Sequence, residues 1–109
     1  MDNNLDLFFA AIADPTRRAV VERLVEGPAS VSELHAPHQM ALPSFMKHLG
    51  KLEEAGLVRS VKSGRVRTLH IEAAPLADAE AWLNRQRGQW SRRLDRLQAL
   101  AEANEEVSQ

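Results

Sequence analysis

The clearest pattern of apolar and polar positions in this chain lies between Ala41 and Val58. If the stretch is helical, one face carries four apolar side chains, which are Leu42, Phe45, Leu49 and Leu52. Pro43 fits only the first turn of a helix, and Gly56 is typical of the left-handed residue that ends one. The pattern therefore predicts a helix that starts near Pro43 and ends near Gly56. Its predicted core residues are Phe45, Leu49 and Leu52.

The preceding stretch carries the start signals of three more helices. Apolar residues recur at helical spacing in residues 4–13, which predicts the first helix. Asp14 followed by a proline is a strong N-cap signal for the second. Ser30 and Glu33 have the spacing of a capping box, which predicts a short third helix. Residues 30–56 are therefore expected to form a helix-turn-helix.

A β-hairpin is predicted directly after the central helix. Residues 57–62 and 65–71 have the composition of strands, and the intervening Ser63-Gly64 pair is typical of a tight turn. Residues 57–71 therefore predict a hairpin with a basic tip, whose cations are Lys62, Arg65 and Arg67.

A long helix is predicted after the linker 72–75. Residues 76–103 contain no proline, and as one helix they would span about 42 Å. An apolar stripe spaced by threes and fours runs along it and contains Leu76, Ala79, Leu83, Gln86, Trp90, Leu94, Leu97 and Ala101 or Leu100. Because such a helix is longer than a small domain can cover, the stripe is expected to bury against another chain.

The outer face of the central helix suits a DNA groove. Pro43 and Ser44 are small and lead the helix, and Lys47 and Lys51 follow; base edges and phosphates require such residues. A solvated amphipathic helix would explain the face equally well, but the adjoining basic hairpin favours DNA. From Ser44 to His70 there are six Lys and Arg against two Glu, although the whole chain has a net charge of −1.

Composition limits the remaining classes. A chain of 109 residues is expected to be one domain, 1–109, and it contains no apolar run long enough to span a membrane. The acidic N-terminus is unlike a signal peptide, so a cytoplasmic location is expected. The absence of cysteine excludes disulfides and thiolate metal sites. With no glycine-rich phosphate loop and no arrangement typical of a nucleophile, an enzyme is not expected.

Four stretches occur in an order that characterises a known family: ADPTRRAVVERL (13–24), SVSEL (30–34), SFMKHLGKLEEAGLV (44–58) and GRVRTLHI (64–71). In this combination, over roughly two thirds of the chain, the sequence resembles the ArsR/SmtB family of bacterial winged helix-turn-helix regulators. The resemblance implies a mainly α fold with a small β-hairpin. It further implies that the long C-terminal helix is a dimerisation helix.

The resemblance implies a sequence-specific DNA-binding regulator, namely a homodimeric repressor, and no cofactor is expected. The implied DNA-facing residues are Pro43, Ser44, Met46, Lys47, His48, Lys51, Lys62, Arg65 and Arg67. The implied dimer interface consists of Leu5, Phe8 and Phe9 near the N-terminus and Leu83, Trp90, Leu94 and Leu97 in the last helix. Two recognition helices about 34 Å apart would require a two-fold symmetric operator in double-stranded DNA.

The metal sites common in this family are not matched here. Where the resemblance implies two cysteines in the third helix, this chain has His35 and Pro37. In the last helix Asp78 and Glu80 remain, but no histidine follows them. We therefore expect no metal site, with His35 and His38 as solvated helix-end and turn residues. An unknown small-molecule inducer is left open.

Some assignments have two interpretations. His48 either faces DNA or packs half-buried, and Arg17 and Arg18 form a solvated pair or, less favoured, contact a phosphate or another subunit. We expect the arginines of the last helix to be solvated or in intersubunit ion pairs rather than on DNA; they are Arg85, Arg87, Arg92, Arg93 and Arg96. The alternative function is a winged-helix protein-interaction module without specific DNA binding. The salt dependence of binding to a specific duplex distinguishes the two functions.

Overall fold

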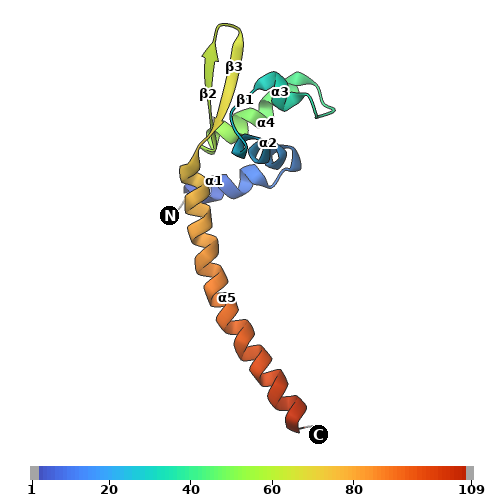
Figure 1. The fold of residues 1–109 in the computed structure, drawn as a ribbon, viewed down its shortest axis with the longest axis vertical. Coiled ribbons are helices and arrows are strands. Elements are labelled where there is room, and N and C mark those ends of the chain that lie inside the picture. The colour runs from blue at the N-terminus through green and yellow to red at the C-terminus, as the bar shows by residue number, and fades with distance from the viewer. Residues whose placement is uncertain (1–2, 108–109) are drawn as a thin grey trace. The chain divides into compact units, whose positions relative to one another are not determined.

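The structure, a computed structural model, describes residues 3–107. It contains two compact units, one that ends at Asp78 and one that begins at Ala79. In chain order the elements are α1 (Asn3–Ile12), α2 (Pro15–Val25), β1 (Ala29–Ser30), α3 (Val31–His35), α4 (Leu42–Glu54), β2 (Val58–Ser63), β3 (Val66–Ile71) and α5 (Ala73–Val107) (Figure 1). The prediction of a mainly α fold with a small hairpin and a long last helix is confirmed.

The first unit contains a three-stranded antiparallel sheet in the order β1-β3-β2. Ala29 and Ser30 of β1 pair with Leu69 and Thr68 of β3, and β2 pairs with β3 along its whole length. The sequence predicted only the hairpin, because a strand of two residues is too short to show an alternating pattern. β1 attaches the start of α3 to the hairpin.

The hairpin turn lies one residue later than predicted. Ser63 pairs with Val66, so the loop is Gly64-Arg65 rather than Ser63-Gly64. Gly64 has a φ of +62°, and no residue other than glycine has a positive φ within residues 3–107. This combination is that of a type II′ turn, which takes glycine at its first central position. Arg65 is therefore part of the tip itself.

The predicted starts of α2 and α3 are confirmed. Asp14 accepts a hydrogen bond from the backbone N–H of Arg17 at 3.0 Å and so caps α2. Ser30 Oγ accepts from the N–H of Glu33 at 3.1 Å, and the Glu33 carboxylate accepts from the N–H of Ser30 at 3.4 Å. These bonds form a capping box and satisfy amides that the first turn leaves free.

α4 begins and ends as its sequence predicts. Pro43 lies in the first turn, and Gly56 follows the C-cap with a φ of +72°. The N–H of Leu57 donates to the carbonyl of Leu52 at 3.0 Å, and the N–H of Gly56 donates to that of Glu53 at 2.9 Å. This pair of bonds is a Schellman motif. It turns the chain from α4 directly into β2.

The core of the first unit lies between α2, α4 and the sheet. Phe45, Leu49 and Leu52 are buried, as predicted. They are joined by fully buried side chains from α2, the α4–β2 junction and β3, which are Val20, Leu24, Leu57 and Leu69. Burying one such side chain contributes roughly 1.5–3 kcal/mol. Leu42 shares the apolar face of α4 but is 48% exposed, because the first turn extends past the core.

α5 starts earlier than predicted. It covers Ala73–Val107, whereas residues 72–75 were expected to be a linker. Pro75 suggested a break, but a proline in the first turn of a helix removes no intrahelical hydrogen bond. Gly88 does not interrupt the helix either. Despite its length, neither α5 nor any other helix within residues 3–107 is apolar enough over a sufficient length to cross a membrane.

Candidate nucleic-acid interface

The outer face of α4 is open to solvent. Its exposed side chains are Pro43, Ser44, Lys47 and Lys51, and Met46 beside them is half-buried. The Lys51 ammonium lies 3.9 Å from the Glu54 carboxylate. Because both of these side chains are largely exposed, the ion pair contributes little and leaves Lys51 available. Small leading residues and two accessible ammonium groups therefore lie along one helix.

The first turn of α4 has free backbone donors. No side chain within residues 3–107 caps the helix at Ala41, and Pro43 has no N–H. The N–H of Phe45, which bonds to the carbonyl of Ala41 at 3.0 Å, is the donor that begins the helical ladder. The N–H groups of Leu42 and Ser44 precede it and have no intrahelical acceptor. Such a helix start can accept an anion.

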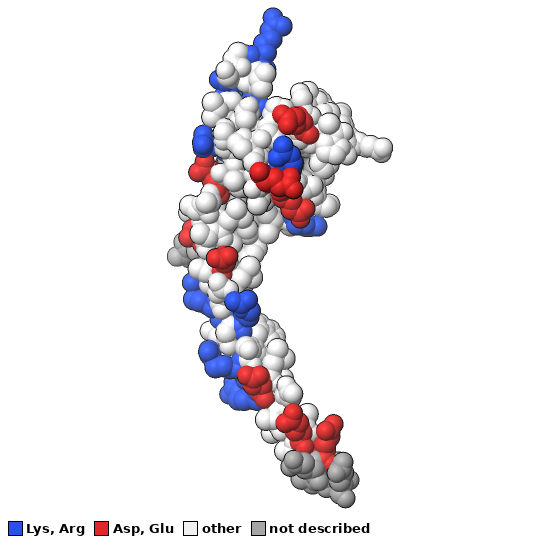
Figure 2. Space-filling view, viewed as in Figure 1, with Lys and Arg blue, Asp and Glu red and all other residues white. Residues whose placement is uncertain are grey.

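The β2–β3 hairpin carries its cations into solvent. Lys62, Arg65 and Arg67 are exposed, and Figure 2 shows basic side chains at the hairpin tip. A groove of about 380 Å³ joins the hairpin to α4 and to the start of α3; it is lined by Ser30, Val31, Ser32, Met46, Lys62, Arg65, Val66 and Arg67. The structure thus brings all three predicted hairpin cations and one predicted residue of α4 to one concave surface.

Two histidines support the turn between α3 and α4. His35 Nε2 lies 2.7 Å from the carbonyl oxygen of Met40 and therefore donates to it. The His35 and His38 rings lie 5.1 and 5.5 Å from the Phe45 ring. The sequence predicted solvated histidines, but both are half-buried, because they cover the core side chain of Phe45. They hold the leading end of α4.

Comparison with known proteins identifies the family. Residues 12–61 match a helix-turn-helix domain. The HTH-type transcriptional regulator Rv2034 of Mycobacterium tuberculosis is 38% identical over 80 residues, which are 73% of this chain and 75% of that protein. The crystal structure of the ArsR family transcriptional regulator RHA00566 shares 54% identity, with a TM-score of 0.78 over 84% of this chain and 94% of that one. The chain belongs to the ArsR family of transcriptional regulators.

A further relative of this ArsR-family chain is the transcriptional repressor SdpR of Bacillus subtilis. It is 27% identical over 75 residues, which are 69% of this chain and 83% of that protein. Members of the family are DNA-binding transcriptional regulators, not enzymes. The open basic surface formed by α4 and the hairpin is therefore the candidate DNA-binding surface of this regulator.

His48 is not free on the outer face of α4. Its side chain is 23% exposed and lies against the start of α2. Its Nδ1 is 3.0 Å from Nη1 of Arg17 and 3.6 Å from Oδ2 of Asp14. The half-buried alternative therefore describes its position, and a contact with DNA stays a prediction.

Arg17 and Arg18 cap the end of α1. Their guanidinium groups donate to carbonyl oxygens there: those of Ala11 and Ala10 for Arg17, at 2.6 and 3.3 Å, and those of Ile12 and Ala13 for Arg18, at 2.8 and 3.1 Å. Arg17 is therefore half-buried rather than solvated, whereas Arg18 is exposed, and a contact of either with a phosphate or another subunit stays a prediction. The link from Arg17 to His48 spans 31 residues, so no local pattern revealed it.

Asp14 is the acidic member of the same cluster. Partial burial raises the pKa of its carboxyl group. The backbone N–H groups of Arg17 and Thr16 and the charges of His48 and Arg17 outweigh that effect, so the pKa lies below its ordinary value. The carboxylate consequently stays ionised while it caps α2.

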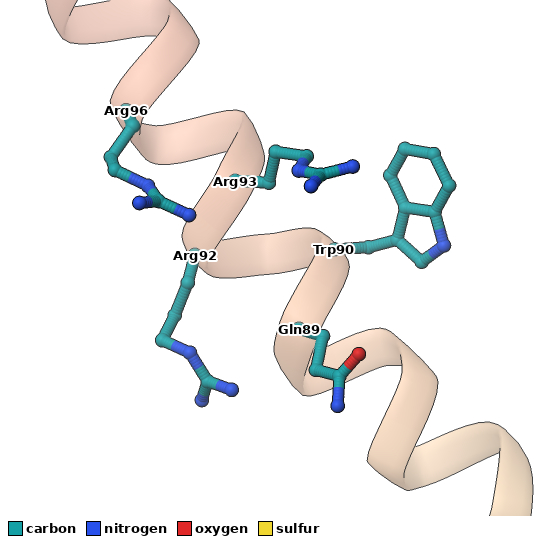
Figure 3. A pocket seen from close by; sticks show the side chains of 5 residues that line it. All are labelled: Gln89, Trp90, Arg92, Arg93 and Arg96. Carbon is teal, nitrogen blue, oxygen red and sulfur yellow. The ribbon is translucent and has the colours of Figure 1, made fainter.

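The second unit presents an apolar stripe to solvent. Leu83, Trp90, Leu94 and Leu97 are all more than half exposed. Trp90 and Arg93 project from one side of α5, and Arg92 and Arg96 from another (Figure 3). A recess beside them has a volume of about 320 Å³, but it is lined by this one helix alone and is open to solvent. The stripe is the more informative feature, because water is a poor environment for so many apolar side chains.

The predicted interface residues of α1 differ in their free surface. Leu5 and Phe9 are half-buried, whereas Phe8 is only 6% exposed. The ring centroids of Phe8 and Phe9 lie 5.4 Å apart in an edge-to-face arrangement. Phe8 therefore has little surface left to offer another chain.

Proposed function

We propose that this ArsR-family regulator is a homodimeric, metal-independent repressor that acts on a two-fold symmetric operator in the cytoplasm. The observation that carries the proposal is the open basic surface that α4 shares with the hairpin. Each protomer inserts the outer face of α4 into a major groove, and its hairpin contacts the adjoining backbone.

Base edges and phosphates are contacted by different residues. Ser44 and Lys47 are the base-edge residues, because a lysine can donate to guanine O6 and N7 and a serine hydroxyl fits either kind of base. Phosphates are contacted by the cations later in α4 and in the hairpin, which are Lys51, Lys62, Arg65 and Arg67. The uncapped start of α4 binds a further phosphate beside Pro43 and Met46.

A second copy of the chain covers the apolar stripe of α5. Leu83, Trp90 and Leu97 recur every seven residues and Leu94 fills the gap, as in helices that pair along a seam. The half-buried Leu5 and Phe9 add to the proposed dimer surface, and Phe8 supports them from within. A dimer presents two recognition helices, which accounts for the two-fold operator.

Repression without a metal agrees with the chemistry of the side chains. His35 uses its Nε2–H for a carbonyl oxygen, so this nitrogen has no lone pair to offer a metal. Within residues 3–107, no three His, Cys, Asp or Glu side chains are grouped closely enough to hold an ion. The relative SdpR, named a transcriptional repressor, supports repression.

The test is fluorescence anisotropy of the purified protein on DNA from upstream of its own gene, here called the operator, with a scrambled duplex as the control. Binding is measured at two salt concentrations, with and without zinc. We expect selective binding, a log–log salt slope of about −0.9 per phosphate contacted, and no effect of zinc. Equal, weak binding to both duplexes would contradict the proposal and favour the protein-interaction module. A change of affinity with zinc would contradict metal independence alone.

A further inference from the structure

We infer that Arg17 positions the recognition helix α4 through His48, and that protonation of His48 exchanges this contact for one with Asp14. Arg17 is thus a positioning residue for DNA recognition, and operator selectivity depends on pH. The inference rests on the proposed function, because it concerns how α4 is held against the operator.

The Arg17–His48 contact fixes the state of the imidazole. A guanidinium group has donors only, so Nδ1 of His48, 3.0 Å from Nη1 of Arg17, must be the acceptor. An accepting Nδ1 carries no proton, which makes the ring neutral and places its single N–H at Nε2.

The Arg17 side chain is anchored independently of His48. Its Nε donates to the carbonyl of Ala11 at 2.6 Å, and its Nη2 lies 3.3 Å from the carbonyl oxygen of Ala10. The guanidinium is therefore fixed to the end of α1 and cannot follow a moving ring. Through it, His48 ties α4 to the α1–α2 corner at a point between Lys47 and Lys51, two predicted DNA contacts.

Protonation reverses the preference of the ring. A proton taken from solvent at Nδ1 converts the acceptor into a donor, and two cationic donors then face each other 3.0 Å apart. An acceptor is close by, since Oδ2 of Asp14 lies 3.6 Å from the same nitrogen. Because Arg17 is anchored, the imidazole ring turns toward Asp14. This movement changes the position of α4 relative to α1 and α2.

Asp14 and Arg17 are the charged groups in contact with the imidazole of His48 within the described part of the chain. Others on α4 and on the elements packed against it are Asp6 of α1, Arg18, Glu22 and Arg23 of α2, Glu33 and His35 of α3, Lys47, Lys51, Glu53 and Glu54 of α4, and Arg59 and Lys62 of β2. Several of these have partners elsewhere: Arg18 bonds to the end of α1, Arg59 pairs with Glu72, and Lys51 pairs with Glu54. The exchange therefore depends on Arg17 and Asp14.

Acidification acts differently on specific and non-specific binding. A new positive charge on α4 strengthens attraction to any duplex, because phosphates are present in every sequence. A shifted recognition helix weakens contacts to base edges, which only the operator supplies. The ratio of operator affinity to scrambled-duplex affinity is therefore the quantity that reports the exchange.

The experiment measures this ratio with the full chain at pH 7.5 and pH 5.5. We expect it to fall roughly three- to tenfold on acidification, near the lower end of the loss expected for one complete base contact. The variant His48→Gln keeps an acceptor for Arg17 but cannot titrate, so its ratio should not change with pH. The variant His70→Gln, which removes a half-buried histidine of β3, is the matched control and should behave as the unaltered protein does. A constant ratio in the unaltered protein, or a pH effect that persists in His48→Gln, would overturn the inference.

A second measurement needs no DNA. Proton–nitrogen NMR correlations of the imidazole at pH 7.5 should show neutral His48 protonated at Nε2 more completely than a free imidazole, and Arg17→Gln should reduce that bias. Protonation at Nδ1 in the unaltered protein refutes the contact whatever the protein binds. Failure to prefer the operator at pH 7.5 would instead refute the proposed function and the DNA consequence drawn from it, while the NMR result still decides the contact.

Discussion

Asp14 is a single residue that contacts two helices, α2 and α4. Its carboxylate caps α2 by accepting a hydrogen bond from the N–H of Arg17 at 3.0 Å, and it lies 3.6 Å from Nδ1 of His48 on α4. The side chain is 29% exposed, so solvent only partly screens these contacts. One carboxylate consequently caps the start of α2 and also contacts α4.

We expect Asp14→Ala to lower the free energy of unfolding by about 1 kcal/mol at pH 7, because it removes an N-cap. The pKa of Asp14 is lowered in the folded state, so its contribution is complete above the pKa of an unfolded aspartate, about 3.9, and is lost as the pH falls through the folded value. Urea unfolding at pH 7 and pH 3 checks both points, with a smaller difference expected at pH 3. Asp14→Asn, which keeps a capping oxygen, is the control and should cost less.

Lys47 is the residue on which base recognition is most directly tested. It is exposed on the outer face of α4, and one good base contact contributes about 1–3 kcal/mol of discrimination. We expect Lys47→Ala to weaken operator binding by that amount relative to the scrambled duplex. Competition titrations with the two duplexes measure the difference. An equal loss on both would identify Lys47 as a phosphate contact instead.

Local and long-range features of single residues differ in how well the sequence predicts them. The cap at Asp14 and the capping box of Ser30 and Glu33 were predictable because each connects residues three apart. The contact between Arg17 and His48 was not, since it exists only after α2 and α4 pack together. The same packing leaves His48 half-buried, while its contact with DNA stays a prediction.

At the scale of elements, the hairpin is the part of the candidate interface that sequence placed almost correctly. Its basic tip was expected, but the turn shifted by one residue because Gly64 supplies the positive φ at the first central position. The strand β1 and the early start of α5 at Ala73 were missed. β1 was missed because two residues are too few for a pattern, and the start of α5 was missed because a proline in a first turn resembles a break.

We expect Arg65→Ala to weaken binding to the operator and to the scrambled duplex alike, because Arg65 lies at the hairpin tip and would neutralise a phosphate. The log–log salt slope should become shallower by about one. Anisotropy titrations at four salt concentrations measure it. Arg59→Ala is a suitable control, because Arg59 is in the same hairpin but pairs with Glu72 at 2.7 Å. An unchanged slope for Arg65→Ala would remove the tip from the interface.

At the scale of the whole molecule, the apolar stripe of α5 is the surface proposed to contact a second copy of the chain. Leu83, Trp90, Leu94 and Leu97 are between 51 and 59% exposed within the single chain. Fully burying one such side chain is worth roughly 1.5–3 kcal/mol, so a shared seam of four from each copy would offset much of the cost of association. The sequence predicted the stripe from its period, although one chain alone cannot reveal the matching surface.

We therefore expect Trp90→Ala to dissociate the proposed dimer. Trp90 is 59% exposed in the middle of the stripe, and large aromatic side chains at such positions typically carry 2 kcal/mol or more of association energy, about a 30-fold weaker dimer. Sedimentation velocity across a range of protein concentrations measures the change. Arg92→Ala is the matched control, because Arg92 leaves α5 on a different side from Trp90 and should preserve the dimer (Figure 3). If Trp90→Ala remained as dimeric as the unaltered protein, the stripe would not be the dimer seam. Operator binding by such a variant would then have to rest on a different pairing of the two recognition helices.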